Sequence, residues 1–80
     1  MKRNILINIR KNLNLSQEEV AERSNISRSY YGLIENGLRN PSYNIANDIA
    51  ITLNQNVEQI FKDEIFFANK CYAKKHINNK

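Results

Sequence analysis

Two closely spaced helix starts constrain the fold of this chain more than any other feature of its sequence. Ser16 opens the segment SQEE, a capping box in which its hydroxyl can accept from the Glu19 amide while the Glu19 carboxylate reaches back. Ser27 is a second residue of the type that caps helix N-termini. The sequence therefore predicts short helices over about residues 16–24 and 27–36.

The ends of these two segments carry local signals as well. Asn25 tolerates the left-handed backbone that terminates many helices, because its short polar side chain can bond locally. Gly37 is suited to end the second segment in the same way. Two short helices joined by a turn of about three residues form a helix-turn-helix arrangement.

Further helical signals flank this pair on both sides. Residues 4–12 are amphipathic, and the spacing predicts an apolar stripe of Ile5, Ile9 and Leu13 beside a row of Leu6 and Arg10. After the loop that contains Pro41, Ser42 is expected to cap a fourth helix and Asn56 a short fifth one. The predicted fold is therefore all-α, with a helical domain over residues 1–61 and a tail over residues 62–80.

The composition excludes several classes of protein. The chain has 80 residues and one Cys, so an internal disulfide is impossible and no Cys/His cluster indicates a zinc site. No apolar run approaches the roughly 18 residues of a membrane span. Without a signal peptide or a catalytic constellation, we expect a cytoplasmic protein that is not an enzyme and needs no metal or cofactor. Its net charge of +4 suits a polyanionic partner.

The segment around residues 27–36 has two different faces on a helical wheel. Tyr30, Tyr31 and Ile34 fall on the side that carries the core residues. The other side is expected to point outward; its members are Arg28, Ser29, Gly32, Leu33 and Asn36. Arg can bond two guanine acceptors, Ser can bond either partner, and an apolar side chain can contact a thymine methyl group.

Polar side chains around this outward face are of the types that bind phosphate. They are Gln17, Asn36, Arg39 and Asn40. Gly32 costs roughly 1 kcal/mol relative to Ala inside a helix, which suggests a close approach by another molecule. The residue types therefore point to DNA as the partner of this face.

The run LSQEEVAERSNISRSYYGLIENGLRNPS, followed by a fourth helix and VEQIF, resembles the Cro/C1-type (Xre-type) helix-turn-helix repressors. The resemblance covers about three quarters of the chain and implies a five-helix, lambda-repressor-like DNA-binding domain. It implies that the segment after Ser27 is the recognition helix in the major groove. The implied base contacts are Ser27, Arg28, Ser29, Gly32 and Leu33. The implied phosphate contacts are Gln17, Asn36, Arg39 and Asn40. It also implies an ion pair between Arg10 and Glu35.

The resemblance implies a sequence-specific regulator of transcription that binds double-stranded DNA. Repression is the commoner role in the family, and two copies on a palindromic operator would supply enough base contacts for tight binding. The tail contains Ile65, Phe66 and Phe67, three consecutive apolar residues that seldom face solvent in a monomer. We expect this segment, as a strand or as a helix extension, to pair two copies of the chain.

A second class of function stays open from the sequence. In this alternative the chain is a protein-interaction module, such as an antitoxin, and its tail binds a partner protein. The oligomeric state of the purified chain discriminates between the two, because a self-pairing tail requires a dimer.

Overall fold

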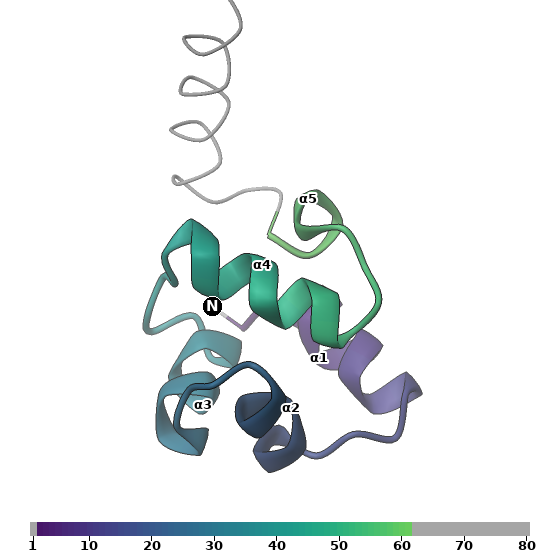
Figure 1. Cartoon of the computed structure of the whole chain (residues 1–80), viewed down its shortest axis with the longest axis horizontal. Helices are drawn as coiled ribbons and strands as arrows, with labels where there is room; N and C mark the ends of the chain where they lie inside the picture. Colours follow the sequence, from purple (N-terminus) through teal and green to yellow (C-terminus); the bar gives the residue numbers. More distant parts are fainter. Residues whose placement is uncertain (1, 62–80) are drawn as a thin grey trace, which may run out of the picture.

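The computed structural model describes residues 2–61, which form five helices (Figure 1). No strand occurs within this range, so the all-α prediction is confirmed. The predicted pairing segment, Ile65, Phe66 and Phe67, lies outside the described residues. The helices are α1 (Asn4–Asn12), α2 (Gln17–Arg23), α3 (Arg28–Glu35), α4 (Tyr43–Thr52) and α5 (Val57–Ile60).

Serine side chains start three of the helices, as their positions in the sequence predict. The hydroxyl of Ser16 accepts from the Glu19 amide at 3.0 Å, and the Ser16 amide donates to the Glu19 carboxylate at 2.8 Å. Ser27 and Ser42 cap α3 and α4 with one such bond each. These bonds satisfy amides that have no partner inside the helix.

Four helices end with the same backbone device. The residue after each C-cap has a positive φ: Asn14, Asn25, Gly37 and Asn54. After α3, for example, the Gly37 amide donates to the Ile34 carbonyl and the Leu38 amide donates to the Leu33 carbonyl. This pattern is the Schellman motif, which pairs the carbonyls left open at a helix end.

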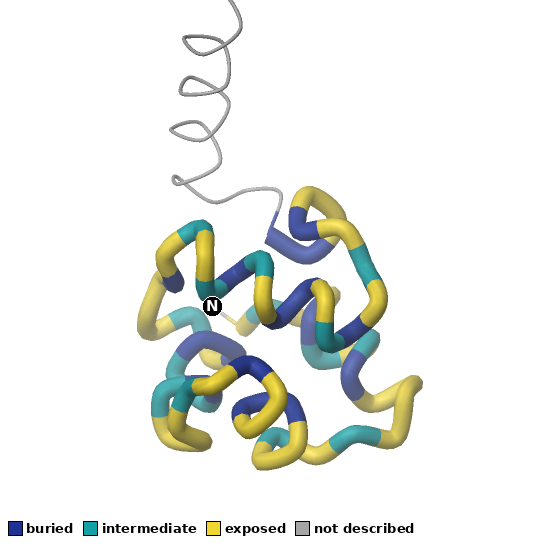
Figure 2. Tube along the Cα trace, viewed as in Figure 1, coloured by how far each residue is buried: buried dark blue, intermediate teal, exposed yellow. Residues whose placement is uncertain are grey.

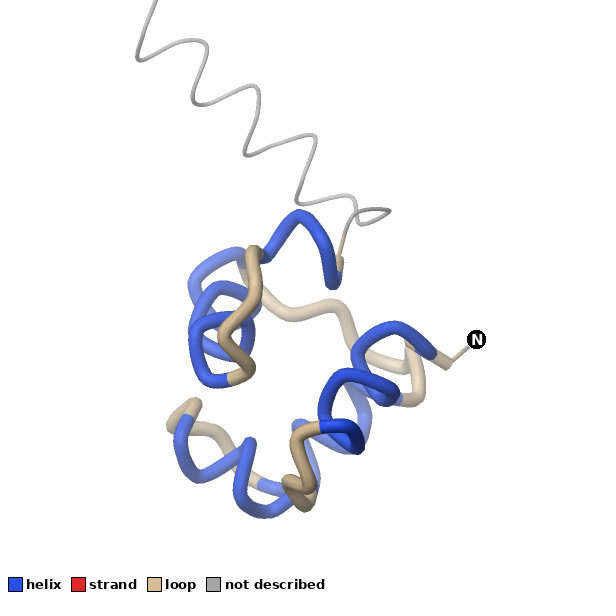
Figure 3. The backbone as a smooth tube through the Cα atoms, turned by 90° about the vertical axis from the view of Figure 1, so that its right-hand side faces the viewer, coloured by secondary structure: helices blue, strands red, loops and turns tan. Residues whose placement is uncertain are grey.

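The helices enclose one apolar core to which all five contribute (Figure 2). Helix α4 packs against both α2 and α5, while α3 packs against α2 and α1. In Figure 1, α2 and α3 lie together below α4, and Figure 3 shows the same bundle from the side. The fully buried residues with the largest side chains are Tyr31, Phe61, Leu6, Ile34, Ile49, Leu53 and Val20.

The predicted apolar stripe of α1 is wrong at its two ends, while its middle member, Ile9, packs partly buried against the core. Ile5 and Leu13 are 43% and 46% exposed, whereas Leu6 and Arg10, from the neighbouring row, are buried. Hydrophobicity alone favours the row of three apolar residues. In the structure the row that contains Arg10 is buried instead. A carboxylate in the interior pairs with Arg10 and offsets the cost of burying its charge.

The described helices lack the length and apolar character that a bilayer-spanning helix needs.

Candidate nucleic-acid interface

The first turn of α3 carries the exposed polar side chains of the predicted base-contacting set. Arg28 and Ser29 are exposed, while Tyr31 and Ile34 on the opposite side are buried in the core. Leu33 is half-buried. Helix α3 thus packs against the domain with one side. Its opposite side faces solvent and begins with the Arg28 guanidinium and the Ser29 hydroxyl.

Ser27 lies at the N-terminus of this exposed face and has a structural task there. Its hydroxyl oxygen accepts from the Tyr30 amide at 3.0 Å and so caps α3. The hydroxyl hydrogen is not needed for that bond, so Ser27 can still donate to an acceptor in solvent or on a ligand.

Gly32 lies closer to α2 than the helical wheel predicts. It is half-buried, and a Cβ atom built on it would lie 4.0 Å from Oε1 of Gln17. That separation is an ordinary van der Waals contact, so the described part of the fold has room for a methyl group here. Packing between α2 and α3 therefore does not explain why a helix interior holds glycine, which is unfavourable there.

Gln17, one of the predicted phosphate contacts, points back toward α3 with its amide. Its Nε2 donates to Oε1 of Glu35 at 2.9 Å, and its side chain is half-buried. One amide hydrogen remains for another acceptor. The bond holds the side chain of Gln17 in place at the start of α2.

Arg10 and Glu35 meet in the interior between α1 and α3. Nε of Arg10 donates to Oε2 of Glu35 at 2.5 Å, and Nη2 donates to Oε1 at 3.2 Å. The side chains are only 10% and 3% exposed. A third bond, from Nη1 to the Leu15 carbonyl at 2.9 Å, ties the pair to the loop before α2. This paired fork geometry is the strongest arrangement that Arg and a carboxylate adopt.

The surroundings of Glu35 keep it ionised. Burial acts to raise the pKa of Glu35, but the bonds from Arg10 and Gln17 outweigh burial and lower it below the ordinary value. The bond to Glu35 likewise raises the pKa of Arg10. Nearby, burial and then the Glu35 carboxylate raise the pKa of Tyr31, whose buried hydroxyl has no hydrogen-bond partner of good geometry among the described residues.

Asn36, Arg39 and Asn40, the other predicted phosphate contacts, are all exposed at the end of α3 and in the loop that follows. The structure brings a further residue to this loop from the N-terminus. Nη2 of Arg3 donates to the Asn40 side chain and to the Arg39 carbonyl. In the sequence Arg3 is one of several basic residues near the chain end, and no local pattern links it to a loop so far along the chain.

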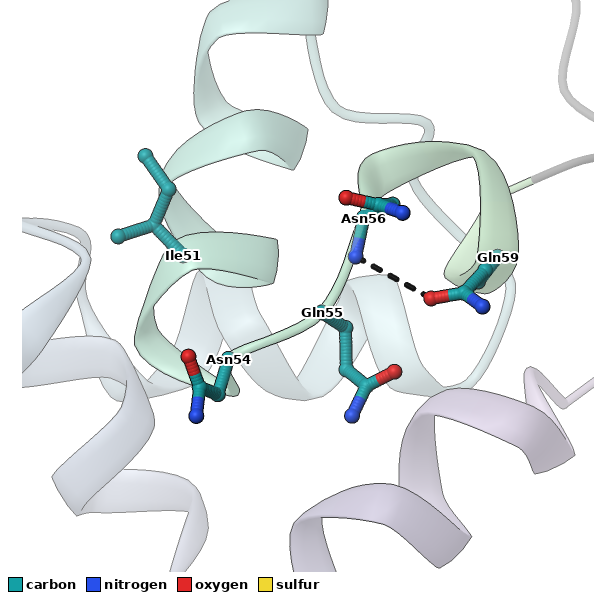
Figure 4. A pocket seen from close by; sticks show the side chains of 5 residues that line it. All are labelled: Ile51, Asn54, Gln55, Asn56 and Gln59. Atoms are coloured by element: carbon teal, nitrogen blue, oxygen red, sulfur yellow. Dashed lines mark hydrogen bonds between the residues drawn. The ribbon is translucent and has the colours of Figure 1, made fainter.

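A pocket of about 290 Å³ lies at the junction of α4 and α5 (Figure 4), where the Asn56 amide donates to the Gln59 side chain at 3.3 Å. Its lining has no titratable group that could transfer a proton. Residues 2–61 also hold no group of His, Cys, Asp or Glu arranged for a metal ion. The pocket is lined by Ile51, Asn54, Gln55, Asn56 and Gln59.

Comparison with known proteins agrees with this geometry. The family described as Helix-turn-helix matches residues 6–60. The chain is 41% identical over 61 residues to YqaF of Bacillus subtilis (strain 168), an uncharacterized HTH-type transcriptional regulator, covering 76% of this chain and 72% of that protein.

Two solved structures share the fold. The clp gene regulator ClgR from Corynebacterium glutamicum superimposes with a TM-score of 0.68 at 19% identity, over 90% of this chain and 77% of that one. A complex of the SinR and SinI proteins gives a TM-score of 0.71 at 21% identity, over 98% of this chain and 80% of the matched chain. The chain therefore belongs to the Cro/C1-type helix-turn-helix family and is a transcriptional regulator with a helix-turn-helix DNA-binding domain.

Proposed function

We propose that this protein is a sequence-specific repressor that acts in the cytoplasm as a homodimer on a palindromic DNA operator. The observation that carries the proposal is the exposed first turn of α3, with Arg28 and Ser29 in solvent while the opposite side of the helix is buried. A helix held in this way can enter the major groove, where those side chains match the donor and acceptor patterns of base edges.

The proposed base contacts are Ser27, Arg28, Ser29, Gly32 and Leu33. Arg28 supplies the bidentate donor, and Leu33 supplies an apolar contact at the half-buried part of the same face. Gly32 contributes by having no side chain, which lets the α3 backbone come close to the DNA where the helix lies in the major groove. This role is consistent with the spare room found around it.

The proposed phosphate contacts are Gln17, Asn36, Arg39 and Asn40. Three of them are exposed amide or guanidinium donors, and the fourth, Gln17, keeps one amide hydrogen after its bond to Glu35. Such contacts set the position of a protein on the duplex but carry no base sequence information.

Dimerisation is proposed because one domain offers only one recognition helix. Two domains on half-sites about 34 Å apart would double the base contacts and impose a two-fold operator. The proposed pairing segment is Ile65, Phe66 and Phe67, on the grounds that consecutive apolar residues seldom face solvent.

A second candidate is a protein-interaction role, such as that of an antitoxin, in which the tail binds a partner protein. One observation favours keeping it: a structural neighbour of this chain, SinR, was solved in complex with another protein, SinI. A purified chain that is monomeric and dimerises only with an added partner would support this candidate over the homodimer.

Selection from a random pool of duplex DNA with the purified full-length protein tests the proposal. An enriched two-fold site is expected. Arg28→Ala should then weaken binding by about 1–3 kcal/mol and relax the preference at one position in each half-site. Arg39→Ala should weaken binding to all sequences about equally.

Lys11→Ala is the matched control for these variants, since it removes one exposed positive charge from the end of α1. It should change affinity less than either Arg variant. If the selected site bound the Arg28 variant and the wild type equally well, the exposed face of α3 would not be the reading surface.

A further inference from the structure

Arg3 reaches from the start of α1 across to the end of α3. Its backbone amide donates to the Glu35 carbonyl at 2.8 Å, and its Nε donates to the Ile34 carbonyl at 2.8 Å. These carbonyls belong to the last turn of α3, where the helix dipole favours a cation. The guanidinium is therefore anchored to the C-terminal end of the proposed recognition helix.

The same guanidinium also forms hydrogen bonds, through Nη2 of Arg3, to the loop that follows α3. It donates to the Asn40 side-chain oxygen at 2.8 Å and to the Arg39 carbonyl at 3.2 Å. The guanidinium carbon lies 5.3 Å from the centre of the Phe61 ring, within the range of cation–π attraction. Because Phe61 is buried, it provides a rigid platform for the Arg3 fork.

We propose that Arg3 is a positioning residue for DNA binding, which orients the side chain of Asn40 toward a phosphate. Arginine has only donors, so the Asn40 atom bonded to it must be the oxygen. The oxygen thus faces Arg3, and because Asn40 is an exposed residue, its NH₂ group can meet an acceptor outside the domain. An outward NH₂ donates to a phosphate oxygen, whereas the flipped amide would present a repelling oxygen.

This inference rests on the proposed function, because it assigns a cause to one of the proposed phosphate contacts. It also predicts that Lys cannot replace Arg3. A lysine ammonium is a single point on a flexible stem and lacks the planar fork that reaches the carbonyls of α3 and the loop together.

A double-mutant cycle on the selected operator tests the inference with the full-length protein. Arg3→Met should weaken binding by about tenfold or more, because the phosphate donor is no longer oriented. In the Asn40→Ala background, the same change should cost less than about twofold, since no side-chain donor remains to be oriented. Affinities are compared at a temperature at which thermal melting shows that all four proteins are folded.

The other outcomes overturn the inference. If Arg3→Met weakens binding by the same factor in both backgrounds, Arg3 either contacts DNA itself or only supports the fold. If Arg3→Lys binds as well as the wild type, the fork geometry is unnecessary. If Arg28→Ala weakens binding while the Arg3 and Asn40 changes do not interact, the proposed function stands and only the role of Arg3 fails.

Asn40→Asp gives a decision even if Arg3→Met does not fold. The aspartate keeps an oxygen for Arg3, so the melting temperature should stay equal or rise, while its outward oxygen repels phosphate. Operator affinity should fall by about tenfold or more, and Asn8→Asp, the same charge change at an exposed position of α1, should have a much smaller effect. Asn40→Asp with wild-type affinity would show that the outward group of residue 40 does not meet DNA.

Discussion

At the scale of single residues, Glu35 connects the interior of the domain to its proposed DNA-binding surface. One carboxylate accepts from Arg10 on α1 and from Gln17 at the start of α2, while belonging itself to α3. The three helices are thereby fixed around one buried charge. Such a network is stable only while every member is satisfied, because an unpaired charge in the interior is costly.

Glu35→Ala should therefore lower the free energy of unfolding by about 3–5 kcal/mol, because it leaves the Arg10 guanidinium buried without its partner. Chemical denaturation followed by circular dichroism measures the change. Glu22→Ala, which removes an exposed carboxylate from α2, is the control and should stay within about 0.5 kcal/mol of the wild type. Equal stability of the Glu35 variant and the wild type would mean that the pair contributes nothing.

The same residue predicts how stability depends on pH. The pKa of Glu35 in the folded state lies below its ordinary value of 4.5, so the unfolded chain binds more protons in acid. Its contribution is fully present above about pH 4.5 and is lost as the pH falls through the folded pKa. Melting temperatures measured between neutral and acid pH should show this loss.

Two variants separate the groups that titrate in this range. In Glu35→Gln the melting temperature should fall less steeply as the pH is lowered, since the variant has no proton to gain at this position. The plot of melting temperature against acid pH is called the acid limb. Bonds from Ser16 also lower the pKa of Glu19, so Glu19→Gln should flatten the limb as well, but Glu19 is exposed and its share smaller. An acid limb that is identical in the wild type and in Glu35→Gln would contradict this assignment.

Residue-level prediction from the sequence succeeded where the signal was local and failed where it was not. The serine caps depend on a few neighbouring residues, and the structure shows them as expected. The buried row of α1 depends on a carboxylate far along the chain, so hydrophobic periodicity placed Ile5 and Leu13 inside in error. The contacts of Arg3 with the loop after α3 have the same long-range character, and no sequence pattern indicated them.

At the scale of elements, α3 combines a strong cap with a weak centre. Ser27 fixes its start and a Schellman motif fixes its end, whereas Gly32 in the middle lowers its intrinsic stability. The faces of α3 were predictable from the helical wheel because a helix repeats at a fixed angle. The position of Gly32 at the edge next to α2 was not, since it depends on how the two helices pack.

Gly32→Ala should raise the free energy of unfolding by roughly 1 kcal/mol, because alanine is the better helix former and the fold has room for its methyl group. Operator affinity should fall in the same variant if the α3 backbone approaches DNA at this point. Thermal melting and a binding titration on one sample separate the two effects. A variant that is more stable and binds as well as the wild type would show that the glycine has no part in binding.

At the scale of the whole molecule, the number and order of the helices follow from the sequence because each helix has its own start and stop signals. The packing of α4 against both α2 and α5 was not readable in that way, although it determines how the helix pair is presented. The base and phosphate contacts stay predictions, which the Arg28 and Arg39 variants test.

The proposed homodimer leads to a prediction about operator length. A duplex with two half-sites about 34 Å apart should bind far more tightly than a duplex with one, since the second domain then binds without a separate association step. Fluorescence anisotropy at fixed salt compares the two, because phosphate contacts make affinity strongly dependent on ionic strength. Equal affinity for both duplexes would indicate that the protein binds DNA as a monomer.

The left-handed residue at the end of each of four helices has a consequence for chirality. A backbone with φ near +60° to +80°, as at Asn14, Asn25, Gly37 and Asn54, is the conformation that a D-amino acid prefers. D-alanine at position 37, placed there by chemical synthesis, would restrict the unfolded chain without strain and add about 0.4–1 kcal/mol of stability. L-alanine at the same position should destabilise the fold, so the two mirror-image forms of one residue are expected to shift the melting temperature in opposite directions.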